Sequence, residues 1–515
     1  MQTYPRSYAV QFLRKHIWNS KVSHTTPKMG RASSRETIFL KPAGQKVKRQ
    51  RDTRKASCPS CIFVISWIIL SCSFCQPSFG CDDVRANLFD FECLDYDAKD
   101  SVFNMTCSFT WTNNTQCIHL FKNERFEGNG HGIYLKGVAN WEGLFRIADS
   151  NNGGPSSLAN APVIRDVHMV DGETSDKGGF IVQANQKNFI VDHCSSSGVI
   201  QGEPSESVSH RGGGGICGHG CSGDILITHC WSSGEIRGTY AGGLVGREFG
   251  VDGDESNTMT ISNCYTTGDI VGDWSGGICG IRAGENNNNG LITIKQCYSL
   301  GEIRGEYSGG ISGGNAARGK CHVFITNSYS RGNMTGPSSG GICGYYTGGL
   351  GGTVVLTKVY ASGQIIHPDA GGLIGHISPN AKEINITMSV FNGETGNMIG
   401  HDGAEELTFK EKNSANLSDI MGTIYCYNDG KEQKECWDTE SIWQQIDDGF
   451  PMLRDMPTSL PSEAAVPSSN PSPTPKKTVT STASPSATPT PRGKRPAMQL
   501  PVQYPVRSVL VNDKQ

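Results

Sequence analysis

Charged residues are scarce in this chain of 515 residues: they make up 18% of it, against about 25% in typical soluble proteins. The net charge is only −3, so the composition as a whole gives no reason to expect a nucleic-acid partner. The chain has no His-Glu-x-x-His motif, no phosphate-binding loop and no Gly-x-Ser-x-Gly elbow in a strand–helix setting. These absences argue against the motif-defined hydrolases and nucleotide enzymes, and no cofactor is expected.

Long apolar runs are also lacking, apart from one between Cys61 and Cys75 that is interrupted only by serines. At 15 residues it is short for a membrane-spanning helix, which needs about 20. Residues 1–60 carry 14 Lys or Arg and two acidic residues, so this flank is expected to stay cytoplasmic. Residues 61–80 are therefore predicted to be the core of a signal peptide cleaved before Cys81, or an uncleaved signal anchor that would be the only membrane contact. Both alternatives send the rest of the chain into the secretory pathway, to the cell surface or beyond. A third alternative is that the apolar run is a buried strand.

Glycine is abundant, with 64 residues, and much of it lies in a repeat between residues 178 and 400. A Gly-Gly-apolar run recurs seven times, and the intervals between successive starts are 36, 28, 34, 33, 31 and 31 residues. The runs begin at Gly178, Gly214, Gly242, Gly276, Gly309, Gly340 and Gly371. Repeats of this length indicate stacked structural units that share one core.

Each unit contains three short apolar pieces separated by glycine-rich turns, and one apolar column passes through Ile227, Ile261, Ile294, Ile325 and Leu356. Strand–turn–strand–turn–strand of this length predicts one coil of a β solenoid, with glycines at corners that need positive φ. The predicted fold is therefore all-β: a parallel β-helix-like solenoid of about seven coils, with disordered N- and C-terminal segments.

These units resemble the GLUG repeat through Gly242-Gly-Leu-Val-Gly246, Ile261-Ser-Asn-Cys-Tyr-Thr-Thr-Gly268 and Asp269-Ile-Val-Gly272. Residues 126–133 are similar to the opening coil of such proteins, and Trp443 with residues 449–453 is similar to their closing segment. The resemblance covers about residues 126–454 and implies a right-handed parallel β-helix. It also implies a secreted or surface protein of the adhesin type, because the repeat is not known as a catalytic unit.

Changes in composition divide the chain further. Residues 457–515 contain 12 of the 24 prolines, interspersed with Ser, Thr and Lys, and a segment of this composition cannot form a packed core. The expected divisions are a basic disordered leader at 1–60, the apolar segment at 61–80, a Cys-rich cap at 81–125, the solenoid at 126–400, a C-terminal cap at 401–456 and a disordered tail at 457–515.

The 19 cysteines fall into two groups. Those outside the repeats are expected to form disulfides, two among Cys81, Cys93, Cys107 and Cys117 and one between Cys426 and Cys436. Those in repeat columns are expected to be buried free thiols, namely Cys194, Cys230, Cys264 and Cys297 in one column and Cys217, Cys279 and Cys343 in another. Disulfides between same-column cysteines of adjacent coils are the alternative, although strands in register aim these side chains poorly. A zinc site at Cys217-Gly-His-Gly-Cys221 near His193 and His229 is a separate hypothesis, but no second paired motif supports it, and no metal is expected.

Two further columns are the candidate ligand ladder. The polar column holds His193, His229, Asn263, Gln296 and Asn327, and the aromatic column holds Trp231, Tyr265, Tyr298, Tyr329 and Tyr360. If these columns are exposed, their side chains would bind sugars. The favoured alternative is structural: the polar column forms a ladder of side-chain hydrogen bonds, and the aromatic column forms a buried stack. Five sequons mark possible N-glycosylation at Asn104, Asn113, Asn333, Asn385 and Asn416.

The sequence therefore favours a non-catalytic extracellular or cell-surface β-solenoid that recognises a glycan or a cell-surface protein. A carbohydrate-active β-helix enzyme of the lyase or epimerase type is the first alternative, resting on fold analogy alone. Its catalytic centre would need clustered carboxylates, whereas Asp224, Asp252 and Asp269 lie in different predicted loops. A purely structural surface component is the second alternative.

Overall fold

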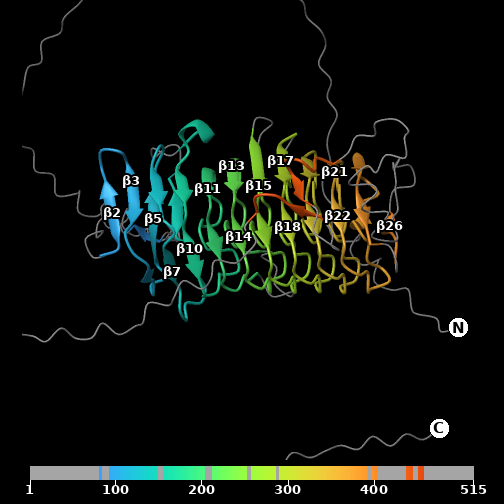
Figure 1. The fold of residues 1–515 in the computed structure, drawn as a ribbon, viewed down its shortest axis with the longest axis horizontal. Helices are drawn as coiled ribbons and strands as arrows, with labels where there is room; N and C mark the ends of the chain where they lie inside the picture. Colours follow the sequence, from blue (N-terminus) through green and yellow to red (C-terminus); the bar gives the residue numbers. More distant parts are fainter. Residues whose placement is uncertain are drawn as a thin grey trace, which may run out of the picture. The chain divides into compact units, whose positions relative to one another are not determined.

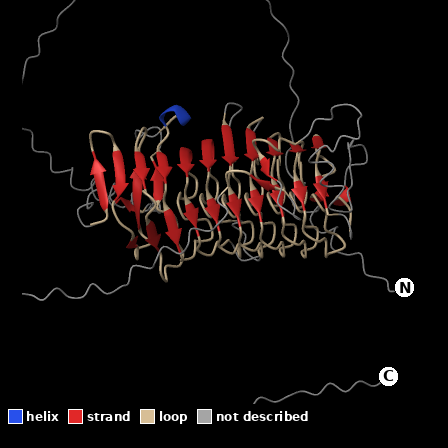
Figure 2. Cartoon of the chain, in the orientation of Figure 1, coloured by secondary structure: helices blue, strands red, loops and turns tan. Residues whose placement is uncertain are grey.

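The computed structural model describes residues 81–83, 92–148, 155–202, 211–251, 257–285, 289–392, 396–402, 437–444 and 451–456. The predicted leader, apolar segment and C-terminal tail lie outside the described residues, as do Asn416, Cys426 and Cys436. The described chain is a stack of β coils that runs from β2 to β26 (Figure 1). Strands dominate it, and the single 3₁₀ turn at Leu158–Asn160 is the one helical element among these residues (Figure 2). No helix in the described ranges is long and apolar enough to cross a membrane.

The largest sheet has 11 strands, and all neighbours in it except β2 and β3 are parallel. In spatial order the strands are β2 (Leu94–Asp97), β3 (Val102–Met105), β6 (Arg125–Glu127), β9 (Val163–Arg165), β11 (Lys187–Asp192), β13 (Ser222–Thr228), β15 (Thr258–Ser262), β17 (Leu291–Lys295), β19 (His322–Thr326), β21 (Thr353–Thr357) and β24 (Glu383–Thr387).

A second sheet of ten short strands forms another wall of the solenoid. It contains β4 (Phe109–Thr110), β7 (Gly132–Tyr134), β10 (His168–Val170), β12 (Ser195–Ser196), β14 (Trp231–Ser232), β16 (Tyr265–Thr266), β18 (Tyr298–Ser299), β20 (Tyr329–Ser330), β22 (Tyr360–Ala361) and β25 (Val390–Phe391).

The remaining strands form small sheets. They are β1 (Asp82–Asp83), β5 (Gln116–Leu120) and β8 (Phe145–Ile147) in one, β23 (Ile374–Ile377) and β26 (Ile399–Asp402) in another, and β27 (Trp443–Gln444) with β28 (Met452–Leu453) in a third. The Gly-Gly runs lie between these elements as single parallel bridges, such as Gly242 to Gly276 and Val245 to Cys279.

Successive coils stack in register, which explains the residue columns of the sequence. Ile261 of β15 faces Ile294 of β17, and Tyr265 of β16 faces Tyr298 of β18. Within β17, Ile292 and Ile294 are buried, whereas Leu291, Thr293 and Lys295 are not, as expected for a strand with one face on the core. The predicted all-β solenoid is confirmed. The parallel stack begins before the first Gly-Gly run, because β3, β6 and β9 already pair in parallel, so it has more coils than the seven units indicate.

The corner after each long strand has a left-handed backbone. The residues of the predicted polar column have φ of 53° at His193, 52° at His229, 55° at Asn263, 53° at Gln296 and 47° at Asn327. Asparagine tolerates this conformation better than most residues. The left-handed residue turns the chain between the two large sheets, which is why strict strand alternation fails there.

Six glycines form a column of close backbone contacts at the next turn: Gly198, Gly234, Gly268, Gly301, Gly332 and Gly363. A Cβ on Gly268 would lie 1.9 Å from the carbonyl oxygen of Gly234, a distance that no side chain tolerates. Adjacent coils approach this closely only because the side chain is absent.

The structure contains three disulfides among the described residues, Cys81–Cys117, Cys93–Cys107 and Cys217–Cys221. In this described part of the chain the free cysteines are buried, and they are Cys194, Cys230, Cys264, Cys279, Cys297, Cys321 and Cys343. The expectation that Cys217 is a free core thiol was wrong: its neighbour Cys221 follows a turn at Gly220, with φ of 71°, that brings the two sulfurs together. With both thiols consumed, the zinc alternative at this motif has lost its sulfur ligands.

Candidate functional site: an aromatic and charged corner

The tyrosines of the predicted ligand ladder are buried. Tyr265, Tyr298, Tyr329 and Tyr360 stack with ring centroids 4.7–4.9 Å apart and are at most 4% exposed. They form their own apolar cluster with Val390, Trp437, Trp443, Leu453 and Met456. Of the two alternatives for this column, the structure therefore shows the aromatic stack covered by protein, and only Trp231 at its end is half-buried.

The cover comes from the predicted closing segment, here called the strap and defined as residues 437–444 and 451–456. The Tyr360 hydroxyl donates a hydrogen bond to the carbonyl oxygen of Pro451 at 2.6 Å. The Trp443 indole nitrogen donates to the side-chain oxygen of Asn327 at 3.3 Å. The strap is thus bound to the solenoid by residues of both predicted columns, the polar one through Asn327 and the aromatic one through Tyr360.

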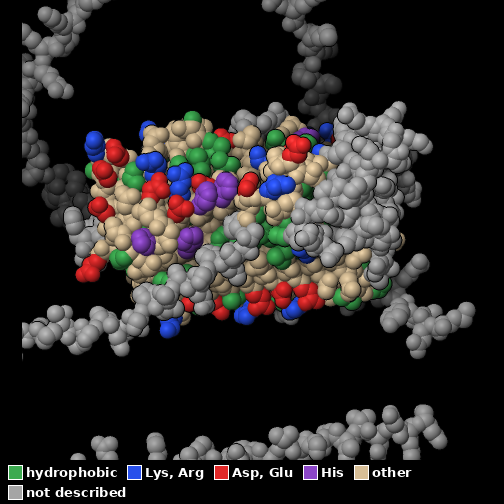
Figure 3. Space-filling model, viewed as in Figure 1, with side chains coloured by type: hydrophobic (Ala, Val, Ile, Leu, Met, Phe, Trp, Pro, Cys, Tyr) green, Lys and Arg blue, Asp and Glu red, His purple; other side chains and the backbone are tan. Residues whose placement is uncertain are grey.

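The polar column does not act as a uniform strip. His193 and His229 are the members with substantial exposure, at 53% and 40% of their side chains, and their rings stack 4.4 Å apart. Asn263 and Gln296 are half-buried. Histidine side chains are visible on the surface in Figure 3 among acidic and basic groups.

Three of the predicted glycosylation sites have exposed side chains, Asn113, Asn333 and Asn385, and Asn104 is half-buried in β3. The Asn113 side-chain oxygen accepts a 2.7 Å hydrogen bond from the Thr115 hydroxyl within the same sequon. The Asn333 side-chain oxygen accepts the backbone N–H of Gln364 in the next coil.

A group of partly exposed rings that the sequence reasoning missed lies at another corner. This aromatic corner comprises Trp274, Tyr307, Tyr345, Tyr346 and His376. The ring centroids of Trp274 and Tyr307 are 4.4 Å apart, and those of Tyr307 and Tyr345 are 4.6 Å apart. His376 stacks on Tyr345 at 4.5 Å. The four larger aromatic residues are half-buried and His376 is buried, so the cluster is partly exposed to solvent.

The Gly-Gly runs position these rings. Trp274 and Tyr307 each lie two residues before a run, with φ of 60° and 62°, and Tyr346 lies six residues after the start of one, also with φ of 62°. The glycines of the runs have no side chains and the other run residues Ile278, Cys279, Ile311 and Ser312 are buried, so no exposed run side chain separates the rings of the two flanking corners. The Trp274 indole lies against Gly314, where a Cβ would be 2.4 Å from its Cε3 atom.

Ion pairs continue the same columns into the preceding coils. This ion-pair strip comprises His219, Arg247, Glu248, Arg282, Glu285 and Arg318. Glu248 contacts Arg247 closely and lies 3.5 Å from Arg282, whose guanidinium is 3.1 Å from Glu285. Glu285 also contacts Arg318. Arg247 is 5% exposed, whereas Arg282 and Arg318 are each 28% exposed.

The strip meets an aromatic ring at one end, where the Arg247 guanidinium lies over the Tyr240 ring, 5.4 Å from its centroid. Burial lowers the pKa of His219, which therefore favours the neutral imidazole beside Glu248. A hydrogen bond to Glu306, with burial second, raises the pKa of Tyr307 to about 12, so the hydroxyl keeps the proton that it donates to Glu306. The combined surface offers ring faces together with directed hydrogen-bonding groups.

The sequence did contain a signal for this site. Aromatic residues recur two positions before the Gly-Gly runs as Tyr240, Trp274 and Tyr307, and polar or aromatic residues recur five or six positions after the starts of the runs. The apolar and aromatic columns of the sequence belong to the wall strands and the polar column to the corner between the two large sheets, whereas these residues belong to the corners beside the Gly-Gly runs.

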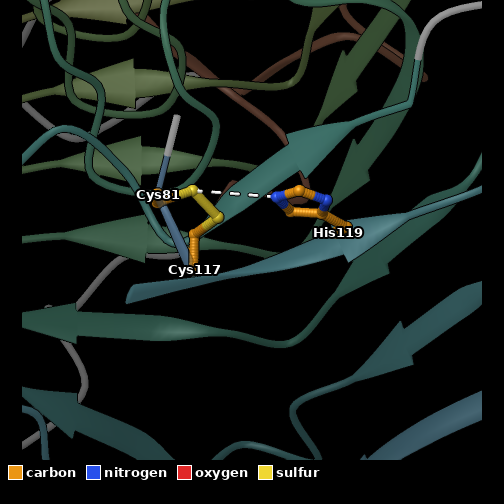
Figure 4. Close-up of side chains that lie close together, drawn as sticks. All are labelled: Cys81, Cys117 and His119. Atoms are coloured by element: carbon orange, nitrogen blue, oxygen red, sulfur yellow. Dashed lines mark hydrogen bonds between the residues drawn. A yellow bond between two sulfur atoms is a disulfide. The ribbon is translucent and has the colours of Figure 1, made fainter. Parts of the chain in front are cut away.

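A third group surrounds the Cys81–Cys117 disulfide (Figure 4). The His119 Nε2 atom lies 3.9 Å from the Cys81 sulfur, and its Nδ1 atom lies 3.7 Å from an Asp83 oxygen. A neighbouring cavity of about 370 Å³ is lined by Cys81, Gln183 and two ion pairs, Lys177–Glu142 and Arg211–Asp176. While the cysteines are bridged they supply no thiolate, so this group has neither a nucleophile nor a set of sulfur ligands.

The comparisons with known proteins give one distant likeness. No protein-family model matches the chain. The comparison with curated proteins gave no significant match. Among solved structures, one described as a "putative immunoglobulin A1 protease" from Bacteroides ovatus matches with a TM-score of 0.33 and 16% identity, over 68% of this chain and 85% of that one.

Proposed function

We propose that this chain is an extracellular or cell-surface β-solenoid that binds a glycan at the aromatic corner and the adjoining ion-pair strip. The observation that carries the proposal is the contact of Trp274, Tyr307 and Tyr345 at one partly exposed surface, although they come from three different coils. Aromatic side chains in contact normally lie in a core, so a partly exposed group of them marks a binding surface.

The chemistry of the surface favours a sugar. The C–H face of a pyranose ring is apolar and packs on indole and phenol rings, while its hydroxyl groups need donors and acceptors at the edge. The Tyr307 hydroxyl oxygen can accept a hydrogen bond from a sugar while its proton is donated to Glu306, and the side chains of Arg282 and Arg318, each 28% exposed, supply donors. The carboxylates of Glu248 and Glu285 are held in ion pairs with these arginines, which fixes their positions and makes them acceptors rather than free acids.

Location supports the same proposal. Three disulfides are typical of proteins that mature in an oxidising compartment. The apolar run at residues 61–75 supplies a route into the secretory pathway, and the resemblance to GLUG repeats adds the precedent of surface proteins.

The test is a glycan array probed with secreted, disulfide-intact protein and with Trp274→Asn. Asparagine removes the ring and accepts the positive φ of this corner. The matched control is Phe324→Thr, which removes a 36% exposed ring from the outer wall at a position where the neighbouring coil has Thr293. We expect binding to one glycan class that Trp274→Asn abolishes and Phe324→Thr preserves.

Two results would contradict the proposal: a blank array, or binding that Trp274→Asn leaves intact. Incubation of the protein with uronate polysaccharides, with and without calcium, distinguishes the enzymatic alternative. Unsaturated products would show that the protein is a lyase and would contradict the proposed binding function.

A further inference from the structure

A separate cluster of metal-ligand residues lies at the corner between the two large sheets, formed by Asp192, His193 and His229. Asp192 ends β11 and His193 follows it directly, while His229 occupies the equivalent corner one coil further on. Adjacent coils stack at about 4.8 Å, so equivalent residues with the same backbone conformation are brought side by side. The two imidazole rings are accordingly stacked, 17° from parallel.

Both histidines direct the same nitrogen at the same oxygen. The Nδ1 atom of His193 lies 2.8 Å from the Asp192 Oδ1 atom, and the Nδ1 atom of His229 lies 3.2 Å from it. The ligand atoms of the three residues all lie within 4.8 Å of one another. Tetrahedral zinc, with bonds of about 2.0–2.2 Å, needs ligand atoms about 3.3 Å apart. The two distances from Nδ1 to the Asp192 oxygen, 2.8 and 3.2 Å, are close to this spacing.

The carboxylate is held by a second layer of residues. Arg165 on β9 donates from its Nε atom to the other Asp192 oxygen at 3.1 Å, and its Nη1 atom lies 3.8 Å from Glu127 on β6. Asp192 is only 15% exposed, so its orientation is fixed while the imidazoles remain accessible. Outer partners of this kind orient a ligating carboxylate.

We propose that Asp192, His193 and His229 form a binding site for a divalent transition-metal ion, with Zn²⁺ as the reference ion. Two imidazoles and one carboxylate match the ligand types of zinc and of its neighbours in the first transition series, but not those of calcium, which takes oxygen ligands. The partial exposure of both rings leaves a fourth position open to water or to a ligand from another molecule. The site is distinct from the aromatic corner and independent of glycan binding.

The test is isothermal titration of untagged, disulfide-intact protein with Zn²⁺, with Ca²⁺ as the hard-ion control. The variants are His193→Asn, His229→Asn and the double variant. Asparagine already occupies the same left-handed corner at Asn263 and Asn327, so these changes preserve the fold while they remove the imidazoles. The matched control is His367→Asn, which removes a 30% exposed histidine elsewhere on the solenoid.

We expect one zinc ion per chain, weakened more than about tenfold by each single substitution, lost in the double variant and unchanged in His367→Asn. The electron paramagnetic resonance spectrum of bound Cu²⁺ should show hyperfine coupling to two imidazole nitrogens. The proposal is overturned if zinc does not bind, if the double variant binds it as well as the unmodified protein, or if calcium binds equally well at the same site.

Discussion

The indole of Trp274 packs on Gly314 so closely that a Cβ at position 314 would approach its Cε3 atom to 2.4 Å. Gly314 does not have a positive φ, so alanine is compatible with the backbone there, and the partly exposed indole is the group that must move. Gly314→Ala should therefore displace one ring of the aromatic corner without unfolding the solenoid. We expect a change in tryptophan fluorescence and about tenfold weaker glycan binding, with an unaltered circular dichroism spectrum. Unchanged fluorescence and affinity together would show that the ring does not depend on this contact.

The glycine column between coils should tolerate no side chain. Gly268→Ala places a Cβ 1.9 Å from the Gly234 carbonyl oxygen, a backbone atom that cannot rotate away. We expect a loss of unfolding free energy of about 1–3 kcal/mol or more, and poor secretion. Gly132→Ala is the matched control, because its new Cβ would meet only the Tyr134 ring at 3.4 Å, an ordinary contact. Chemical denaturation of both variants measures the difference, and equal stabilities would contradict the packing argument.

The strap should loosen when its hydrogen bond to the tyrosine stack is removed. Tyr360→Phe leaves the Pro451 carbonyl and the Arg331 guanidinium without the hydroxyl that both contact, at a cost of about 1 kcal/mol. Hydrogen exchange should then increase in residues 451–456 before it increases in the coils. Tyr265→Phe is the control, because the Tyr265 hydroxyl is buried and has no hydrogen-bond partner among the described residues. Its removal should be neutral or slightly stabilising, and the opposite order of effects would contradict the assignment.

The buried thiols should make the protein sensitive to alkali. Burial raises the pKa of Cys194, Cys230 and Cys264 well above the ordinary value of 9.0, and raises that of Cys343 to about 12. Below pH 9 the thiols are protonated in both the folded and unfolded states, and their contribution to stability is complete. Above it the unfolded chain loses protons first, so the free energy of unfolding should fall by about 1.4 kcal/mol per pH unit for each such cysteine.

Guanidinium denaturation between pH 7 and pH 10 measures this slope. Cys264→Val, which introduces the residue that the same column holds at Val359, should make the slope shallower by one thiol. A slope unaffected by this substitution would mean that other groups carry the pH dependence. Native protein at pH 8 should also resist alkylation at these cysteines, whereas unfolded protein should not.

The columns of the sequence predicted the walls of the solenoid because register stacking repeats each wall residue at a fixed interval. The pairing of Ile261 with Ile294 and of Tyr265 with Tyr298 could be predicted from the sequence for that reason. The sequence could not predict whether the tyrosine column faces the protein or the solvent. His229 and Asn263 turn the chain through a left-handed corner, which interrupts the alternation of side chains between the two faces of the strand. The Cys217–Cys221 disulfide was not predicted either, because it depends on a local turn that brings the two sulfurs together and not on the column.

The aromatic corner was not predicted from the sequence, for a related reason. Its rings come from corner positions of different coils, and their contact depends on the glycines between them rather than on any motif. The histidine pair was noticed in the sequence, but Asp192 was not, because it is an ordinary last residue of a strand until the coil beside it brings His229 to the same oxygen.

The strap has a consequence for the order of synthesis. Coils can stack one by one as the chain emerges from the ribosome, since each needs only its predecessor. The tyrosine stack, however, is completed by Trp437, Trp443, Leu453 and Met456, which are translated after every coil that they cover. Until then a growing solenoid carries an uncovered apolar face, and a nascent chain halted before residue 437 would leave it permanently open to aggregation or to chaperones.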